Sequence, residues 1–424
     1  MNVAESAALA LTAREEGWEE AKSDDEADLV LLNTCSVRAT AEQRVIGRLA
    51  HYKAKKKKGA SFALVVAGCM AERLGEKLKE KGADYLLGTS ARSRFPLILE
   101  AVMNGKKDVF YEECTFKFSS FHHDEANPFR SFIPIMHGCD NYCSYCVVPY
   151  VRGREVSRSP LAIIDEMRSV SALGVREITL LGQNVNSYEC DGLNFPSLLK
   201  LLAEELRKND TLRWIRFLSS HPKDFSEDLI RVIADNPSIC HHIHLPLQSG
   251  SNRVLSEMNR RYTREKYLDL VRSLRSAMGD LSLSTDILVG FPGETGDDLE
   301  ETLSLMEEVK FLYAYMYHYN PREGTEAFKL PGRIDSDVKR ERLSRVIALQ
   351  KRHTQELLKK RIGSDVTVLI EGISRKNADE LVCRTEHDEM VVVPGSAGAL
   401  GSMATLTLSA LRGNTFRSQV IKRS

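Results

Sequence analysis

The sequence lacks the features that mark membrane-embedded and exported proteins. No apolar run approaches the roughly 20 residues that cross a bilayer, and the chain does not open with a signal-peptide pattern. Its nine cysteines are an odd number at uneven spacings, which argues against a disulfide framework and for reduced thiols. Neither sign of charge dominates, because 59 basic side chains balance 59 acidic ones. These absences exclude a chain-wide electropositive field and predict a cytoplasmic protein that does not contact membranes.

Three cysteines stand close together near the middle of the chain, at Cys139, Cys143 and Cys146. Their spacing lets one short loop hold three thiolates around a single point, and thiolates are the protein ligands of iron–sulfur clusters. A four-iron cluster bound by three cysteines keeps one iron without a protein ligand. S-adenosylmethionine is the obvious ligand for that iron, since one electron can then cleave its sulfonium to give a carbon radical.

A structural zinc site is the main alternative for this triplet, because zinc takes four closed tetrahedral ligands. Its fourth ligand would be His137 or one of three distant cysteines, namely Cys190, Cys240 and Cys383. A Cys-x3-Cys-x2-Cys triplet without a second close pair is an uncommon zinc pattern but a specific one for radical chemistry. The sequence therefore favours the iron–sulfur cluster.

The first 110 residues alternate helix-like and strand-like patterns, which predicts an open parallel α/β domain. Apolar runs over 27–34 and 62–68 predict two buried strands, and each run leads directly into a cysteine, Cys35 or Cys69. Carboxyl ends of parallel strands meet at one edge of an open sheet, so these cysteines are expected to lie close together. They are either two small core residues or further cluster ligands, and the nearby triplet favours ligands.

Helical patterning already begins at Asn2, with no strand before it. A parallel α/β sheet that opens on a helix lacks its first strand. The loop after that strand would be the natural place for a third ligand beside Cys35 and Cys69. We therefore expect the natural protein to extend upstream of Met1 by one strand.

Residues 132–360 alternate strand and helix patterns six times and end on a long charged helix over 335–361. This repeat predicts an incomplete, TIM-like (β/α)6 barrel, in which function gathers at the carboxyl ends of the strands. A turn or a cap explains any one polar residue there, but their recurrence at six ends predicts a ligand pocket. The first end carries Cys139, and the other five carry Gln183, Asn184, Ser219, Ser220, His221, Gln248, Ser249, Glu294, Asn320 and Arg322.

The long helix over 335–361 is amphipathic, and its pattern predicts which side chains pack. The expected packing residues are Val338, Leu343, Val346, Ile347 and Leu349. Between the first domain and the barrel, residues 111–131 have little periodicity and are expected to form a linker.

After Gly363 the pattern changes to β-rich runs over 366–370, 390–393 and 403–408, separated by glycine, asparagine and aspartate. These runs predict a small antiparallel β-barrel over 361–424. Small five-stranded barrels often bind oligonucleotides. The stretch from Met390 onward holds four basic residues and no acidic one, although acidic residues earlier in the module offset that charge.

Five stretches together resemble the radical-SAM methylthiotransferases, and within them the MiaB subgroup that modifies tRNA. They are residues 33–38, 67–70, 139–153, 181–188 and 290–295. The resemblance extends over nearly the whole chain. It implies an N-terminal methylthiotransferase α/β domain (1–110), the linker (111–131), a radical-SAM partial barrel (132–360) and a TRAM β-barrel resembling the OB fold (361–424).

By this resemblance, the chain adds a methylthio group to carbon-2 of N6-isopentenyladenosine beside the anticodon of tRNA. That C–H bond is strong and not acidic, so a carbon radical generated at the Cys139, Cys143 and Cys146 cluster must attack it. The family supplies the sulfur from an auxiliary four-iron cluster held by three cysteines. Cys35 and Cys69 match two of those ligands, and relatives carry the third in a Cys-Gln-Met-Asn run whose match here begins just after the cysteine.

The resemblance also implies a set of binding and catalytic residues. We expect the S-adenosylmethionine pocket to include Tyr145, Gln183, Gln248 and Glu294, although packing inside the barrel mouth explains Tyr145 equally well. The catalytic candidates are Gln183, Asn184 and Arg152. Arg152 can pair a carboxylate or phosphate bidentately, and an ordinary surface ion pair is the alternative.

The expected partners are the anticodon stem-loop of tRNA and an electron donor such as flavodoxin or ferredoxin, with the protein itself a monomer. Single-stranded loops expose bases that can be splayed out and stacked, and the target base must enter the pocket. Two alternatives remain. The same chemistry can act on threonylcarbamoyl-adenosine tRNA or on a ribosomal protein, or the chain binds tRNA and has lost sulfur transfer with its third auxiliary cysteine.

Overall fold

The protein is described here by a computed structural model covering residues 2–36, 39–106, 116–118, 128–418 and 421–422. It divides into two compact units. The first unit comprises Met1–Asp124, His137–Arg158 and Arg322–Phe328, and the second comprises Glu125–Met136, Ser159–Pro321 and Lys329–Ser424. The loop with the three clustered cysteines therefore belongs to the same unit as the N-terminal sheet.

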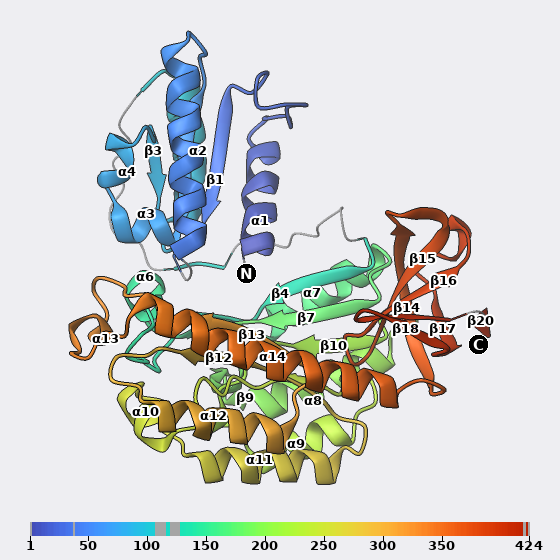
Figure 1. The fold of residues 1–424 in the computed structure, drawn as a ribbon. Coiled ribbons are helices and arrows are strands. Elements are labelled where there is room, and N and C mark those ends of the chain that lie inside the picture. Colours follow the sequence, from blue (N-terminus) through green and yellow to red (C-terminus); the bar gives the residue numbers. More distant parts are fainter. Residues whose placement is uncertain (1, 37–38, 107–115, 119–127, 419–420, 423–424) are drawn as a thin grey trace. The chain divides into compact units, whose positions relative to one another are not determined.

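The first unit is built on a parallel sheet of three strands in the order β1-β2-β3 (Figure 1). These strands are β1 (Leu29–Thr34), β2 (Ala63–Gly68) and β3 (Tyr85–Leu87). Helices α2 (Ala39–Lys57) and α3 (Cys69–Leu74) pack on one face of the sheet, and α1 (Asn2–Glu15) and α5 (Phe95–Met103) pack on the other. Because both faces are covered, the strands are largely apolar, which confirms the predicted parallel α/β arrangement.

The remaining parts of the first unit are short. A two-stranded pair formed by β5 (Met136–His137) and β6 (Val156–Ser157) brackets the cysteine loop and α6 (Val148–Arg152). Helix α4 (Lys77–Glu80) and the 3-10 turn η1 (Arg92–Arg94) follow the second and third strands of the sheet. The predicted linker falls mostly on residues 111–115 and 119–127, which lie outside the described residues.

The second unit contains the predicted six parallel strands in chain order, within the described residues. They are β4 (Arg130–Pro134), β7 (Glu177–Leu181), β10 (Trp214–Phe217), β11 (His242–His244), β12 (Ser282–Val289) and β13 (Tyr313–His318). One parallel bridge between Ile215 and Ile239 links the first three strands to the last three. The incomplete TIM-like barrel is therefore confirmed.

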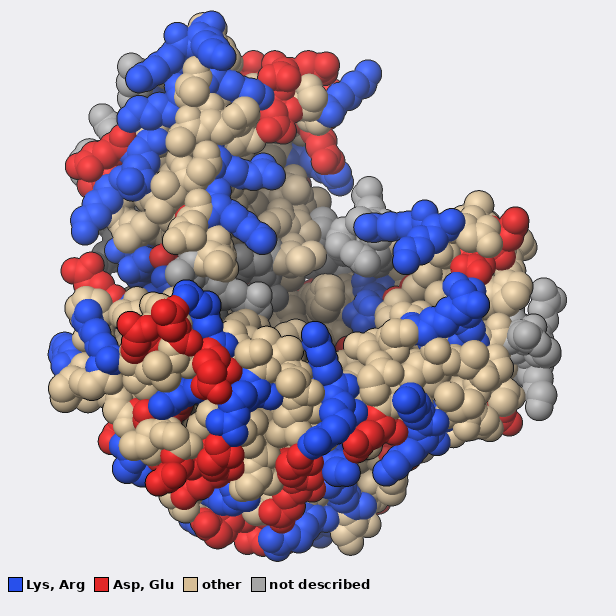
Figure 2. All heavy atoms as spheres, in the orientation of Figure 1, with Lys and Arg blue, Asp and Glu red and all other residues tan. Residues whose placement is uncertain are grey.

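Helices follow the strands and cover the outside of this barrel (Figure 1). They are α7 (Pro160–Ala172), α8 (Phe195–Arg207), α9 (Glu227–Ala234), α10 (Asn252–Glu257), α11 (Arg264–Ala277) and α12 (Gly296–Val309). Basic and acidic side chains are interspersed over these helices on the face shown in Figure 2, in keeping with the balanced composition. None of the helices in the described part of the chain is long and apolar enough to traverse a lipid bilayer.

The long helix α14 (Ser336–Lys360) forms as predicted, and of its expected packing residues only Val338 is exposed, while Leu343, Ile347 and Leu349 are partly buried. Val346 is fully buried, whereas Val338 is 40% exposed. Much of the buried face is polar, because it forms hydrogen bonds to the residues just before β13. Gln350 donates to the Phe311 carbonyl at 2.8 Å, and Thr354 donates to the Leu312 carbonyl at 2.6 Å. Buried carbonyls need such partners, and an apolar pattern does not reveal them.

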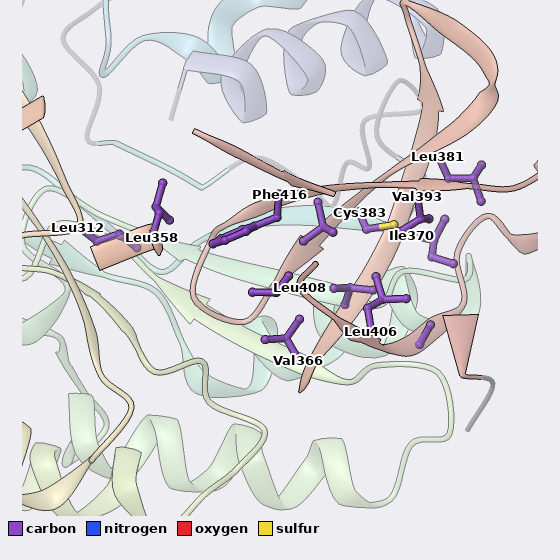
Figure 3. Close-up of a cluster of buried hydrophobic side chains, with 13 residues drawn as sticks. Leu312, Leu358, Val366, Ile370, Leu381, Cys383, Val393, Leu406, Leu408 and Phe416 are labelled. Atoms are coloured by element: carbon purple, nitrogen blue, oxygen red, sulfur yellow. The ribbon is translucent and has the colours of Figure 1, made fainter. Parts of the chain in front are cut away.

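The C-terminal part is a seven-stranded sheet in the order β18-β19-β16-β15-β14-β17-β20. The strands are β14 (Asp365–Ser374), β15 (Asn377–Thr385), β16 (Met390–Pro394), β17 (Met403–Thr407), β18 (Ala410–Arg412), β19 (Thr415–Arg417) and β20 (Ile421–Lys422). The three predicted runs are strands, but the prediction missed β15, whose charged first half hides its pattern. One pair, β16 with β19, is parallel, so the sheet is not wholly antiparallel as predicted. Figure 3 shows its apolar core around Phe416, Leu406 and Ile370.

Candidate metal and cofactor site

Backbone geometry folds the cysteine loop back onto the chain that follows it. The backbone N–H of Cys139 donates to the Gly153 carbonyl at 3.2 Å, and that of Cys146 donates to the Cys143 carbonyl at 2.9 Å. Gly138 has a φ of 80°, and a Cβ there would lie 2.0 Å from the Arg154 carbonyl oxygen. Only glycine fits such a close approach, so the residue before Cys139 fixes where the loop begins.

The three loop cysteines are free thiols, with Cys139 and Cys143 buried and Cys146 partly exposed. Burial raises the pKa of Cys139 to about 11, so its thiolate requires a nearby cation such as bound iron. The three sulfurs are not all within 4.8 Å of one another: within the described residues the only such group of possible ligands is Asp280, Glu386 and His387. Sulfurs on tetrahedral zinc are about 3.8 Å apart, given bonds of about 2.3 Å. Three thiols on one short loop are a donor set for a four-iron cluster with one open iron, whereas a structural zinc ion needs a fourth ligand.

Two of the three distant cysteines of the zinc alternative are ordinary interior side chains. Cys240 packs with Trp214 and Leu369. Cys383 lies in the core of the C-terminal sheet (Figure 3), where burial raises its pKa to about 12. Neither environment favours a thiolate, and Cys190 is partly exposed in the short strand β8 (Glu189–Cys190).

Cys35 and Cys69 leave the N-terminal sheet at the same edge. Strands β1 and β2 are in parallel register, with Thr34 opposite Gly68, and the two cysteines follow these residues. A Cβ at Gly68 would lie 2.6 Å from the Thr34 carbonyl oxygen, so glycine permits this close approach. Cys69 is buried and Cys35 is partly exposed, as expected for two side chains at the carboxyl edge of a parallel sheet.

A buried ion cluster that the sequence did not reveal lies beside Cys69. Arg152 Nη1 donates to Glu5 Oε1 at 2.8 Å, and Arg92 Nη2 lies 2.7 Å from the same oxygen. Burial alone would raise the pKa of Glu5, but the charges of Arg152 and Arg92 outweigh it and lower that pKa to about 2. Arg152 is thus neither a surface ion pair nor exposed.

His137, which precedes the loop, belongs to the same neighbourhood. Its Nδ1 lies 3.5 Å from Arg152 Nη1, and its ring stacks on Phe116 with centroids 3.6 Å apart. Burial, together with the charges of Arg152 and Arg92, lowers the pKa of His137 to about 3. The imidazole is therefore neutral at physiological pH.

In the second unit, several of the buried polar atoms without a hydrogen-bond partner lie at the carboxyl ends of strands. They come from the residues after β7, β10 and β13, namely Gln183 Oε1, both amide atoms of Asn186, Ser220 Oγ, His221 Nε2 and Tyr319 Oη. Buried polar groups are normally satisfied, so such a set at one edge of a barrel fits a polar ligand like S-adenosylmethionine. Asn186 and Tyr319 were not singled out from the sequence.

The other predicted pocket residues are positioned differently. Asn184 is fully buried and bonded on both sides, donating to Asp224 Oδ2 at 2.7 Å and accepting from the His221 N–H at 3.2 Å. Glu294 Oε1 accepts from the Gly290 N–H at 2.9 Å and from Arg342 Nη1 at 2.7 Å. Both side chains are therefore held by contacts within the second unit.

Gln248 and Tyr145 lie on loops. Gln248 is buried with a φ of 69°, and its backbone pairs with β12 through the Asp286 carbonyl at 2.8 Å. Its left-handed backbone is uncommon for a residue other than glycine and marks a functional position in many proteins. Tyr145 is partly buried within the cysteine loop.

Two histidines inside the barrel were missed from the sequence, His242 and His244 on β11. Each contacts Ser284 Oγ, through His242 Nε2 at 3.0 Å and His244 Nδ1 at 3.1 Å. Spacing of two residues on a strand places both side chains on one face. That His-x-His spacing was the signal available in the sequence.

Comparison with known proteins agrees with this geometry. Residues 133–306 match the family model "Radical SAM superfamily", and residues 1–88 match "Uncharacterized protein family UPF0004". The partial barrel and the thiolate loop thus define a radical SAM enzyme, which uses S-adenosylmethionine and a four-iron, four-sulfur cluster. More particularly, the chain belongs to the family of the tRNA-2-methylthio-N(6)-dimethylallyladenosine synthases, as the full-length relatives show.

One relative with this name, from Treponema denticola, is 46% identical over 99% of this chain and 97% of its own length. Another, from Thermoanaerobacter pseudethanolicus, is 39% identical over 100% of this chain and 91% of its own length. Among solved structures, the radical S-adenosylmethionine methyltransferase TsrM from Kitasatospora setae aligns with a TM-score of 0.55 at 15% identity, covering 76% of this chain and 66% of that one. The likeness to TsrM shows the fold alone.

Proposed function

We propose that this chain transfers a methylthio group to carbon-2 of N6-dimethylallyladenosine in tRNA, next to the anticodon. The observation that carries the proposal is the presence of two cysteine sets, Cys139 with Cys143 and Cys146, and Cys35 with Cys69, in one unit of a chain similar over its full length to enzymes of that name. When bound, the cluster at the first set with S-adenosylmethionine supplies a carbon radical, and an auxiliary cluster at the second set supplies the sulfur.

The chain's own residues hold these groups and orient them. The Cys139 N–H bond to Gly153 and the glycine at 138 fix the thiolate loop. Thr34 Oγ1 donates to the Ala67 carbonyl at 2.6 Å and accepts from the Met70 N–H at 3.2 Å, which ties together the two strand ends that carry Cys35 and Cys69. Preorganised ligands of this kind are expected where a metal group is bound.

In the barrel, Gln183 and Asn186 offer unpaired amide atoms, and Ser220 and His221 offer an unpaired hydroxyl and ring nitrogen. Burial, with nearby Arg260, lowers the pKa of His221 to about 2, so His221 serves as a neutral hydrogen-bonding group and not as a cation. We assign Gln183 and Gln248 to this pocket, and Tyr145 of the cysteine loop stays a candidate neighbour of bound S-adenosylmethionine. Asn184 and Glu294 would act as positioning residues, and Arg152 stays a candidate whose side chain is held by Glu5.

The finer features of the proposal concern partners and context. The C-terminal sheet, as a TRAM-like module, would hold the anticodon stem-loop of tRNA through phosphate contacts. A small electron-transfer protein such as flavodoxin or ferredoxin would deliver the electron. The protein would act as a monomer in the cytoplasm.

Mass spectrometry of tRNA nucleosides tests the activity. Cells that lack the gene should lose the 2-methylthio group from N6-dimethylallyladenosine and regain it with the intact gene but not with Cys143→Ala. Loss of the methylthio group from threonylcarbamoyl-adenosine, or from a ribosomal protein, would instead indicate the related substrate. An unchanged nucleoside profile in the deletion strain would reject the proposal.

A further inference from the structure

The last three barrel strands bring a carboxylate, an imidazole and a phenol ring together on one face of their sheet. Strands β11, β12 and β13 are neighbours, and Asp286 on β12 lies opposite Tyr315 on β13 in the parallel register. His244 on β11 joins them, because its Nε2 lies 3.4 Å from Asp286 Oδ2. Its ring also contacts that of Tyr315 edge-on, with centroids 5.7 Å apart. The three side chains therefore share one place on the barrel wall.

This face is the interior of the barrel, and the structure leaves it open. Thr285 and Ile287, which flank Asp286 in the chain, are fully buried and point to the opposite face, which the helices cover (Figure 1). A central strand residue inside a closed barrel is packed in a core. Tyr315 is nevertheless 54% exposed, and 28% of the Asp286 side chain is exposed. A ligand that enters the barrel can therefore reach both residues.

Histidines hold the Asp286 carboxylate, and no arginine or lysine does. His244, which faces Asp286 through Nε2, is itself held by Ser284, since His244 Nδ1 lies 3.1 Å from Ser284 Oγ. The same hydroxyl lies 3.0 Å from His242 Nε2. Within the part of the chain that the structure describes, no arginine or lysine forms an ion pair with Asp286. Asp286 thus offers the lumen a fixed hydrogen-bond acceptor of negative charge.

N6-dimethylallyladenosine has the chemistry that matches this wall. Its N6–H is a donor for a carboxylate oxygen, and its flat base and apolar dimethylallyl group can pack on an aromatic ring. A threonylcarbamoyl group on the same nitrogen instead carries a carboxylate, which is ionised at neutral pH. Beside Asp286, that second negative charge would be repelled.

We propose that Asp286 and Tyr315 determine the specificity of this chain, receiving a base with a neutral, apolar N6 substituent and rejecting one with an anionic substituent. This inference rests on the proposed function, because it takes the tRNA base as the occupant. It also separates the proposed substrate from threonylcarbamoyl-adenosine, since specificity often depends on repulsion of the wrong ligand. S-adenosylmethionine contains an adenosine as well, so its binding is measured separately.

The measurement is the affinity of the anaerobically reconstituted full-length chain for labelled anticodon stem-loops, by fluorescence anisotropy at one salt concentration. The stem-loops differ only at the target position, which is adenosine, N6-dimethylallyladenosine or N6-threonylcarbamoyl-adenosine. The salt-dependent phosphate contacts then cancel in the ratio of dissociation constants. The parent should bind the dimethylallyl stem-loop most tightly.

Asp286→Asn keeps the size of the side chain and removes its charge. It should narrow the preference for the dimethylallyl over the threonylcarbamoyl stem-loop at least about tenfold, because juxtaposed like charges are strongly unfavourable. Asp269→Asn is the matched control, since Asp269 is an exposed aspartate on α11, and it should keep the parent's preference.

Tyr315 gives a separate test that holds even if Asp286→Asn does not fold. Tyr315→Ala should weaken the dimethylallyl complex about tenfold, which is a typical loss when an aromatic ring that stacks on a base is removed. Tyr315→Phe keeps the ring and should stay near the parent value.

An unchanged preference in Asp286→Asn would overturn the inference, as would parent affinity for the dimethylallyl stem-loop in Tyr315→Ala. Variants that lose affinity for S-adenosylmethionine in equilibrium dialysis, while their stem-loop affinities stay at parent values, would also overturn it. A parent that binds all three stem-loops equally would contradict the proposed substrate as well. A parent that prefers the dimethylallyl stem-loop, with the same preference in Asp286→Asn, keeps its proposed function and loses only the role of Asp286.

Discussion

At the scale of single residues, the site depends on close backbone approaches that only glycine permits. Gly138 is the sharpest case, because its left-handed backbone and its contact with the Arg154 carbonyl both exclude a side chain. Gly68 has the same relation to Thr34 at the edge that carries Cys69. The cysteines can ligate a metal group only if these backbones keep their positions.

Gly138→Ala should therefore lose the radical-SAM cluster. Its Cβ cannot remain 2.0 Å from the Arg154 carbonyl, so the loop must shift away from the position that its hydrogen bonds fix. Iron content after anaerobic reconstitution measures the loss. Gly174→Ala is the control, since Gly174 also has a positive φ of 91° but nothing within 4 Å of its Cβ. Equal iron in the two variants would contradict this reading of the loop.

At the scale of elements, local patterns were informative wherever packing was apolar. They predicted β1 and β2, whose two faces are covered, and the six barrel strands. They were incomplete on α14, where buried polar residues share the packing face, and they failed where a strand begins with exposed charges, as in β15. A hydrophobic pattern indicates only which apolar side chains are buried, so it does not reveal the hydrogen bonds that Gln350 and Thr354 donate.

The two valines on α14 test the corrected packing face. Val346→Ala removes fully buried methyl groups and should lower the free energy of unfolding by about 1 to 3 kcal/mol. Val338→Ala changes a 40% exposed side chain and should stay within about 0.5 kcal/mol of the parent. Urea unfolding of the two variants measures both values. Equal destabilisation would restore the face predicted from the sequence.

At the scale of the whole molecule, the contacts around the site join distant parts of the sequence. Glu5 and Arg152 are 147 positions apart, and Arg322 pairs with Glu42 across 280 positions at 2.8 Å. The cysteine triplet was predictable because its spacing is local, and Cys35 and Cys69 because parallel strands share an edge. The ion cluster of Glu5, Arg92 and Arg152 was not predictable, because nothing in the sequence pairs a carboxylate on the first helix with an arginine beyond the cysteine loop.

Buried neutral histidines also act on the molecule as a whole, through its stability. Burial lowers the pKa values of His221 to about 2 and of His242 to about 3, from an ordinary value of 6.5. Below pH 6.5 the unfolded chain therefore binds protons at these histidines that the folded chain does not bind. The free energy of unfolding should fall as pH decreases below 6.5. Each histidine contributes up to about 1.4 kcal/mol per pH unit.

Urea midpoints between pH 8 and pH 5 measure this dependence. His221→Gln should weaken the dependence of the urea midpoint on pH, because the unfolded chain then has one histidine fewer to protonate. His51→Gln should leave it unchanged, since His51 is exposed on α2. A slope in His221→Gln equal to that of the parent would show that His221 takes up its proton in the folded state.

The central claim is that one chain holds two separate clusters, and iron counting tests it most directly. After anaerobic reconstitution the parent should bind about eight irons, while Cys143→Ala and Cys69→Ala should each bind about four. Cys240→Ala is the control, because Cys240 is an apolar core residue, and it should keep the parent value. Undiminished iron in Cys143→Ala, or about four irons in the parent and in Cys69→Ala alike, would contradict the account.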